Sequence, residues 1–154
     1  MIEAEGGECI LIPGDLSKEA NCKKAVNKTV KKFGRIDVLI NNAAIHFEAK
    51  NLGDITTDQL IKTFSTNIYS YFWVTQAALP HIPEGGCIIN TSSVTAYRGS
   101  PALIDYASTK GAIVSFTRSL ASNLTKRKIR VNGVAPGPVW TPLIASTFKP
   151  EKIS

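Results

Sequence analysis

The feature that most constrains the fold of this chain is the alternation of short apolar runs with longer amphipathic segments. The apolar runs cover residues 9–12, 36–40, 87–91 and 130–135, and apolar residues recur every three or four positions within 17–33, 57–79 and 106–124. Continuous apolar runs are typical of parallel strands buried on both faces, and each parallel connection needs a crossover helix. The pattern therefore predicts an α/β fold with a doubly wound parallel sheet and right-handed crossovers.

Local signals mark the ends of the expected helices. Ser17 is a candidate N-cap for the first helix, and Gly34 follows its last periodic residue as a C-terminal stop. Thr56 and Gln59 have the spacing of a capping box, and the helix that they open can continue as far as Pro80.

Length and composition indicate one globular domain over residues 1–154. With 44% hydrophobic residues, a chain of 154 residues can bury one substantial core. The formal charge of +6 raises the possibility of a nucleic-acid partner. The basic residues instead lie along one amphipathic helix and at the end of another, without a nucleic-acid motif; they are Lys23, Lys24, Lys28, Lys31, Lys32, Lys126, Arg127 and Lys128. We therefore expect no nucleic-acid partner.

The cysteines, histidines and hydropathy favour a reduced, cytoplasmic protein without a metal. Cys9, Cys22 and Cys87 are an odd number without CxxC spacing, which is typical of buried thiols. Neither His46 nor His81 has a second ligand at a suitable spacing, so both are interpreted as structural. The sequence begins without a signal-peptide pattern, and no apolar run approaches the roughly 18 residues of a membrane span.

The candidate chemistry lies where predicted strands end, which is the edge of a parallel sheet at which ligands bind. Tyr106 and Lys110 are four residues apart, so a helix places both on one face about one turn apart. A nearby ammonium favours the phenolate form and is expected to lower the pKa of the Tyr106 phenol. Ser92 and Ser93 end a predicted strand 13 residues before this pair, counted from Ser93. The spacing of the Tyr106 and Lys110 pair alone is weak evidence of function.

Five motifs in sequence order resemble the short-chain dehydrogenase/reductase family. They are Asn41-Asn42-Ala43-Ala44 after a strand, Asn67 within a helix, Ile89-Asn90-Thr91-Ser92-Ser93 ending a strand, Tyr106 with Lys110, and Pro136-Gly137-Pro138-Val139-Trp140-Thr141-Pro142 after the last strand. The runs 94–113 and 132–143 are similar to the glucose/ribitol dehydrogenase-like subgroup. That resemblance implies hydride transfer between NAD or NADP and an alcohol or carbonyl substrate, such as a sugar, polyol or aldehyde.

The resemblance implies four catalytic residues. Tyr106 would be the general acid/base at the substrate oxygen, and Ser93, chosen over Ser92 by its spacing to Tyr106, would hydrogen-bond that oxygen. Lys110 would lower the pKa of Tyr106 and bind the nicotinamide ribose. Asn67 would hold a water in a proton relay, or serve as a buried polar residue that bonds backbone, and the two roles are compatible.

The resemblance also implies the cofactor contacts. Ala44 stands where the family usually has glycine, which weakens that contact. For Asp15 the alternative is a carboxylate that caps the helix after it. The implied contacts are Asp15 and Leu16 at the adenine, Asn41, Ala43 and Ala44 along the adenosine ribose, Tyr106 and Lys110 at the reactive end, and Pro136, Gly137, Val139 and Thr141 around the nicotinamide.

One expected element of a Rossmann-like fold does not occur in the sequence. A dinucleotide fold holds the pyrophosphate on a glycine-rich turn after its first strand, and the family version is TGxxxGxG. No such run occurs here, so we expect an incomplete Rossmann-like sheet that lacks its first two strands and this turn, and in which residues 9–12 have no neighbouring strand. The edge of the strand at 36–40 is expected to be apolar and unpaired.

Two functions are compatible with these features. The first is an oxidoreductase of which this sequence is a fragment, acting on a small alcohol or carbonyl compound and assembling as a homodimer or homotetramer. The second is a catalytically inactive chain that pairs with full-length subunits through the helices at 57–79 and 106–124. The choice between NAD and NADP depends on residues in the missing turn and second strand.

Overall fold

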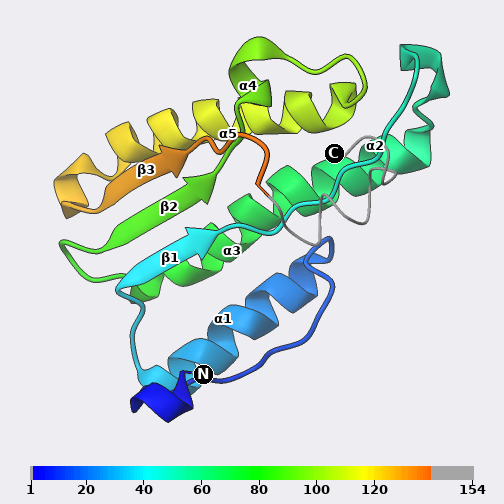
Figure 1. Cartoon of the computed structure of the whole chain (residues 1–154). Helices are drawn as coiled ribbons and strands as arrows, with labels where there is room; N and C mark the ends of the chain where they lie inside the picture. The colour runs from blue at the N-terminus through cyan, green and yellow to red at the C-terminus, as the bar shows by residue number, and fades with distance from the viewer. Residues whose placement is uncertain (1, 140–154) are drawn as a thin grey trace.

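The computed structural model describes residues 2–139, which form a three-stranded parallel sheet (Figure 1). The strands are β1 (Val38–Asn41), β2 (Cys87–Thr91) and β3 (Arg130–Val134), in the order β1-β2-β3. The register places Leu39 beside Ile88, and Ile88 beside Val131. The predicted α/β class and parallel sheet are confirmed.

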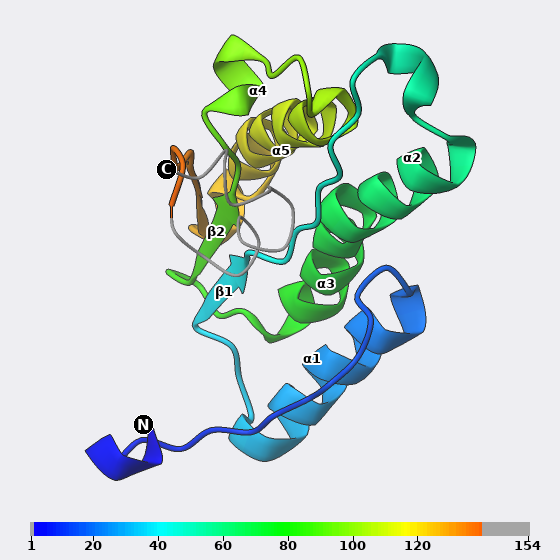
Figure 2. The same cartoon turned by 45° about the vertical axis from the view of Figure 1, so that its right-hand side comes forward.

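Helices cover one face of this sheet. α1 (Glu19–Phe33), α3 (Ser70–Ala78) and α5 (Ile104–Asn123) lie on the same side, with α1 beside α3 (Figures 1 and 2). The core forms between the sheet and these helices, and its fully or nearly buried members are Val26, Ala78, Ile82, Ile88, Leu124, Ile129 and Val131. Burial of such aliphatic side chains stabilises the fold by about 1.5–3 kcal/mol each.

The predicted helix after Thr56 begins as expected but is interrupted. The Thr56 hydroxyl accepts a hydrogen bond from the Gln59 backbone N–H at 3.1 Å, as its capping position predicts. α2 (Thr57–Phe64) then passes into a π-helical turn, η3 (Ser65–Tyr69), before α3 and the 3-10 turn η4 (Leu79–His81). Asn67 lies in this π-helical turn, a feature that is frequent at functional sites.

The start of α1 differs from the sequence prediction. Lys18, and not Ser17, is the N-cap residue, and its side chain makes no capping hydrogen bond. The reason is local, because the Ser17 backbone N–H donates to the Asp15 carboxylate at 2.9 Å in a turn that precedes the helix. Gly34 ends α1 as predicted, with a φ of 82° and a hydrogen bond from its N–H to the Val30 carbonyl.

The apolar run at 9–12 does not form a strand. Leu11 is 91% exposed, and a strand cannot form without a neighbour for its backbone groups.

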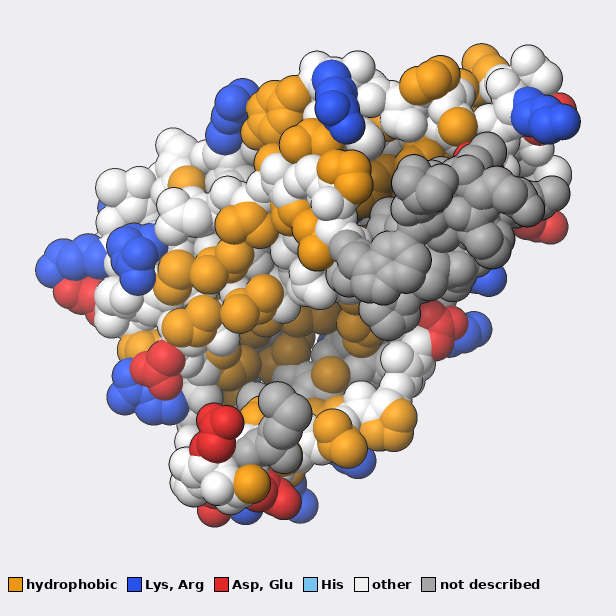
Figure 3. Space-filling model, viewed as in Figure 1, with side chains coloured by type: hydrophobic (Ala, Val, Ile, Leu, Met, Phe, Trp, Pro, Cys, Tyr) orange, Lys and Arg blue, Asp and Glu red, His pale blue; other side chains and the backbone are white. Residues whose placement is uncertain are grey.

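The face of the sheet opposite the helices carries no helix among residues 2–139, and Val38 and Ile40 of the edge strand are 53% and 61% exposed. Figure 3 shows hydrophobic side chains over this face. Among residues 2–139, β1 pairs with β2 alone, so its other edge is apolar and unpaired there, as the sequence predicts.

Short elements complete the described part of the chain. They are η1 (Glu3–Glu5), η2 (Leu52–Asp54), α4 (Thr95–Arg98) and η5 (Thr125–Arg127). Within residues 2–139, no helix combines the length and the apolar character that crossing a membrane requires.

Candidate active site

The segments that follow the three strands meet at the carboxyl edge of the sheet, where the first turns of α5 also lie (Figures 1 and 2). Backbone hydrogen bonds join the segments after β2 and β3. The Ser92 N–H donates to the Val134 carbonyl at 2.7 Å, and the Val94 N–H donates to the Pro136 carbonyl at 3.1 Å. This edge therefore brings together motifs that are far apart in the sequence.

Lys110 is buried beside the Tyr106 ring. Both lie on α5, and the Lys110 Nζ atom is 5.4 Å from the centroid of the Tyr106 ring. The ammonium donates to the Thr91 carbonyl at 2.7 Å, and the Tyr71 hydroxyl donates to the same oxygen at 3.2 Å. Lys110 is only 1% exposed, and this burial lowers its pKa to about 8. The lysine therefore stays predominantly protonated at neutral pH.

Burial raises the pKa of the Tyr106 phenol, and an interaction with the Ser93 hydroxyl opposes the rise. The sequence predicts the opposite direction from the proximity of Lys110. Desolvation of the phenolate is the larger effect in the folded chain, because the ring is half-buried while the ammonium is directed to the Thr91 carbonyl. The folded chain thus holds Tyr106 as a protonated phenol.

The two consecutive serines after β2 have different partners. Ser92 is buried and its hydroxyl donates to the Lys110 carbonyl at 2.8 Å, which fastens the strand end to α5. The Ser93 hydroxyl accepts from the Thr95 N–H at 3.2 Å and interacts with Tyr106. Ser93, and not Ser92, therefore lies beside the Tyr106 phenol.

Asn67 connects the π-helical turn to two neighbouring segments. Its carboxamide accepts from the Ile45 N–H and donates to the Ile45 carbonyl, each at 2.8 Å, and it also donates to the Thr109 hydroxyl at 3.1 Å. The Thr109 hydroxyl in turn donates to the Tyr106 carbonyl at 2.7 Å. Asn67 thus has the backbone-binding role considered from the sequence, and its water-holding role stays a prediction.

The side chain of Asn41 is directed into the interior. Its amide donates to the Thr75 hydroxyl at 3.0 Å and to the Asn90 carboxamide oxygen at 2.9 Å. Both donors are therefore used in a polar network between β1, α3 and β2. Ala43 and Ala44 follow in the segment after β1 and are half-buried.

Asp15 and Leu16 lie in the turn before α1. The start of α1 is at the end of the molecule to which the strands point (Figures 1 and 2). Hydrogen bonding to Ser17, with a smaller contribution from the charge of Lys62 on α2, lowers the pKa of the exposed Asp15 carboxyl. The carboxylate thus closes a turn one residue before the N-cap, close to the capping alternative considered from the sequence.

The segment after β3 contains the remaining predicted contacts. Pro136 is half-buried against the segment after β2, whereas Gly137 and Val139 are exposed. The contact predicted for Thr141 lies outside the described residues.

Three residues at the site have no clear signal in the sequence. The His46 ring contacts the Tyr106 ring edge to face, with centroids 5.1 Å apart, and burial lowers its pKa. Asp105 is 2% exposed and precedes Tyr106 directly, and Tyr71 donates to the same carbonyl as Lys110. Only the pairing of segments distant in the sequence reveals these contacts.

No group of three or more His, Cys, Asp or Glu residues suited to a metal ion occurs within 2–139.

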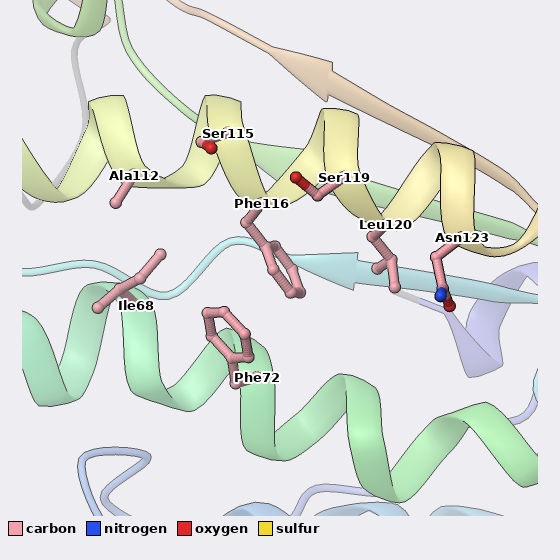
Figure 4. A pocket seen from close by; sticks show the side chains of 8 residues that line it. All are labelled: Ile68, Phe72, Ala112, Ser115, Phe116, Ser119, Leu120 and Asn123. Atoms are coloured by element: carbon pink, nitrogen blue, oxygen red, sulfur yellow. The ribbon is translucent and has the colours of Figure 1, made fainter.

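An apolar groove of about 650 Å³ lies away from this site, between α3 and α5 (Figure 4). The Phe72 and Phe116 rings contact each other in its lining, with ring centroids 4.4 Å apart. Its lining consists of Ile68, Phe72, Ala112, Ser115, Phe116, Ser119, Leu120 and Asn123.

Comparison with known sequences shows similarity to one family of dehydrogenases and reductases. The sequence model described as short chain dehydrogenase matches residues 1–152. The chain is 55% identical over 150 residues to the chloroplastic NADPH-dependent aldehyde reductase 1 of Arabidopsis thaliana, covering 97% of this chain and 52% of the relative. It is 53% identical over 144 residues to the glucose and ribitol dehydrogenase of Daucus carota, covering 94% of this chain and 50% of the relative.

A solved structure shows the same arrangement. The fold is similar to a short chain dehydrogenase from Burkholderia cenocepacia in complex with NADP, with a TM-score of 0.88, 36% identity, and coverage of 92% of this chain and 58% of that one. The chain therefore spans about half the length of the curated relatives it matches.

Proposed function

Because this chain belongs to the short-chain dehydrogenase family, we propose that it supplies the catalytic edge for hydride transfer between NAD or NADP and an alcohol or carbonyl substrate. The observation that carries the proposal is the cluster of Tyr106, Lys110 and Ser93 at the carboxyl ends of the strands. A protonated phenol, a fixed hydroxyl and a buried ammonium are the groups that proton transfer at a substrate oxygen needs.

The residues present fit the reactive end of a nicotinamide cofactor. The Lys110 ammonium has three N–H donors, and the Thr91 carbonyl takes one, so the others can bind ribose hydroxyls. The sequence has no glycine-rich turn for the pyrophosphate, so these residues supply only part of a dinucleotide site. When bound, the nicotinamide would provide or accept the hydride.

In the direction of reduction, the Tyr106 hydroxyl donates its proton to the carbonyl oxygen as the hydride reaches the carbon. The raised pKa of Tyr106 in the folded chain supports this role, because the proton is present at neutral pH. The Ser93 hydroxyl donates to the same oxygen and stabilises the charge that develops on it. In the direction of oxidation, the Tyr106 phenolate takes the proton from the substrate hydroxyl, and the Lys110 charge favours the phenolate before this transfer.

Two relatives support a substrate class. An aldehyde reductase and a glucose and ribitol dehydrogenase are both more than half identical to this chain. We therefore include sugars, polyols and aldehydes among the substrates to test.

The experiment requires a polypeptide of the relatives' full length. A chimera would join this chain to the segments of the Arabidopsis aldehyde reductase that lie outside the match. We expect it to oxidise reduced nicotinamide cofactor when an aldehyde is added, in an absorbance assay. A folded chimera that binds the cofactor and turns over no aldehyde, sugar or polyol would contradict the proposal.

A second candidate function is pairing with another subunit without catalysis. The apolar groove between α3 and α5 favours such pairing, because it exposes a large hydrophobic side chain to solvent. Phe72, which lines the groove, is 44% exposed. The same surface would serve a homodimer of the active enzyme. Sedimentation of the 154-residue chain tests it.

A further inference from the structure

Asp105 is a buried carboxylate at the site that the proposed reaction does not use. It is 2% exposed and is the second residue of α5, directly before Tyr106. A carboxylate in such a position costs free energy unless hydrogen-bond donors surround it. The hydrogen-bond partners of Asp105 therefore indicate its role.

The carboxylate joins α5 to α2. One oxygen accepts from the Thr63 hydroxyl at 2.8 Å and from the Gln59 amide at 3.1 Å, and both donors lie on α2. The other oxygen accepts from the Tyr106 backbone N–H at 2.8 Å. Thr63 is fully buried, so its hydroxyl depends on this partner.

These hydrogen bonds fix the position of the first turn of α5, which contains Tyr106. The first N–H groups of a helix have no partner within the helix, and Asp105 occupies one of them. The hydrogen bonds from Thr63 and Gln59 join this turn to α2. The Tyr106 ring contacts the His46 ring and lies beside the Lys110 ammonium.

We infer that Asp105 is a positioning residue for Tyr106, which uses Thr63 and Gln59 on α2 to set the place of the phenol. This inference rests on the proposed function for its catalytic meaning, and the geometric part is separate from it. It assigns to the two α2 residues a role at the site although neither touches the phenol.

Hydrogen bonding and charge can be separated by two substitutions. Asp105→Asn keeps an oxygen for the Tyr106 N–H, and its amide can meet a rotated Thr63 hydroxyl and a reoriented Gln59 side chain. Asp105→Ala removes every one of these bonds. A positioning role predicts that the asparagine variant behaves like the wild type and the alanine variant does not.

The first measurement uses NMR on the full 154-residue chain. In Asp105→Ala we expect the Tyr106 amide to exchange about 10- to 100-fold faster and the ring contact between Tyr106 and His46 to weaken. The Tyr71 ring, which is 1% exposed, serves as an internal reference and should be unchanged. Asp58→Asn is the matched control, because Asp58 is an exposed carboxylate in the first turn of α2.

If Asp105→Ala does not fold, Thr63→Val gives the same test from the other side, with Thr63→Ser as the conservative control. The valine keeps the shape of the side chain and loses the donor, so the Tyr106 amide should again exchange faster. Unchanged exchange and an unchanged Tyr106 ring contact in the folded alanine or valine variant would overturn the inference.

The second measurement uses the chimera described above. Asp105→Ala should lower kcat about 10- to 100-fold with little change in KM, and Asp105→Asn should restore kcat. Equal losses of kcat in both variants would show that the charge acts directly, which would overturn the positioning role. An inactive wild-type chimera would count against the proposed function alone, since the NMR result decides the positioning of Tyr106.

Discussion

Asn67 and Ile45 hold each other through a reciprocal pair of hydrogen bonds, each 2.8 Å long. The pair ties the π-helical turn after α2 to the segment that follows β1. Because Asn67 also donates to Thr109 on α5, one buried carboxamide joins three segments beneath the proposed site. The contacts of the Asn67 side chain thus stabilise the π-helical turn.

We expect Asn67→Ala to lower the free energy of unfolding by about 2–4 kcal/mol, because it leaves the N–H and carbonyl of the half-buried Ile45 and the buried Thr109 hydroxyl without this partner. Urea unfolding followed by circular dichroism measures the loss. Asn42→Ala, at an exposed position in the segment after β1, is the control and should change the stability by less than about 0.5 kcal/mol. Equal stability of the two variants would contradict the role given to Asn67.

The two serines after β2 should separate stability from catalysis. Ser92→Ala removes a buried hydrogen bond to the Lys110 carbonyl and is expected to cost about 1 kcal/mol of stability. Ser93→Ala loses the longer hydrogen bond from the Thr95 N–H, at 3.2 Å, so it should cost less stability than Ser92→Ala and lower kcat of the chimera about 100-fold. Thermal unfolding and steady-state kinetics of the pair provide the test, and a reversed pattern would mean that Ser92 faces the substrate.

The burial of Lys110 predicts a pH dependence of stability. Its pKa is about 8 when folded and 10.5 at its ordinary value, so between these pH values the unfolded chain binds more protons. The free energy of unfolding therefore rises as pH increases from about 8 towards 10, by up to about 3 kcal/mol. Above pH 10 the raised pKa values of Tyr71 and Tyr106 act in the opposite direction, since the unfolded chain then loses phenol protons first.

Urea titrations at several pH values between 7 and 10 measure this rise, and Lys110→Met is the matched variant. Methionine has a similar shape and no charge, so its stability should not rise over this pH range. Burial also raises the pKa of the Cys22 thiol, which acts in the opposite direction equally in both variants. A wild-type profile parallel to that of the methionine variant would show that the ammonium is not the source.

The groove between α3 and α5 predicts self-association of the chain. Phe72→Glu places a charge in the groove and should shift the sedimentation coefficient from that of a dimer to that of a monomer. Leu52→Glu is the control, because Leu52 is 69% exposed and lies outside the groove. A wild-type chain that sediments as a monomer at high concentration would contradict this assignment.

Elements with strong local signals could be predicted from the sequence. The strand Cys87–Thr91 has the predicted bounds, Thr56 begins its helix and Gly34 ends its own as expected, because capping and buried apolar runs depend on neighbouring residues. Other features depend on partners distant in the sequence. Residues 9–12 have the composition of a strand and no strand to pair with in the described part of the chain. Ser17 is not the N-cap residue because its N–H binds Asp15.

The candidate site shows the same division. The spacing of Tyr106 and Lys110 predicts that they share a face of the helix, which they do. The direction of the Tyr106 pKa depends on how deeply tertiary packing buries the ring, and spacing carries no information on that depth. The contacts of His46 and Asp105 likewise arise only when the segment after β1 and α2 pack against α5.

The role of Tyr106 as acid/base is tested by Tyr106→Phe in the chimera. The comparison variant is Tyr69→Phe, which alters a tyrosine that is 47% exposed on the π-helical turn. Phenylalanine keeps the ring and removes the proton that Tyr106 would donate. We predict that Tyr106→Phe lowers kcat by at least about 100-fold while cofactor affinity stays within about threefold, and that Tyr69→Phe retains activity. Retained turnover in Tyr106→Phe would contradict the assignment of Tyr106 as the acid/base.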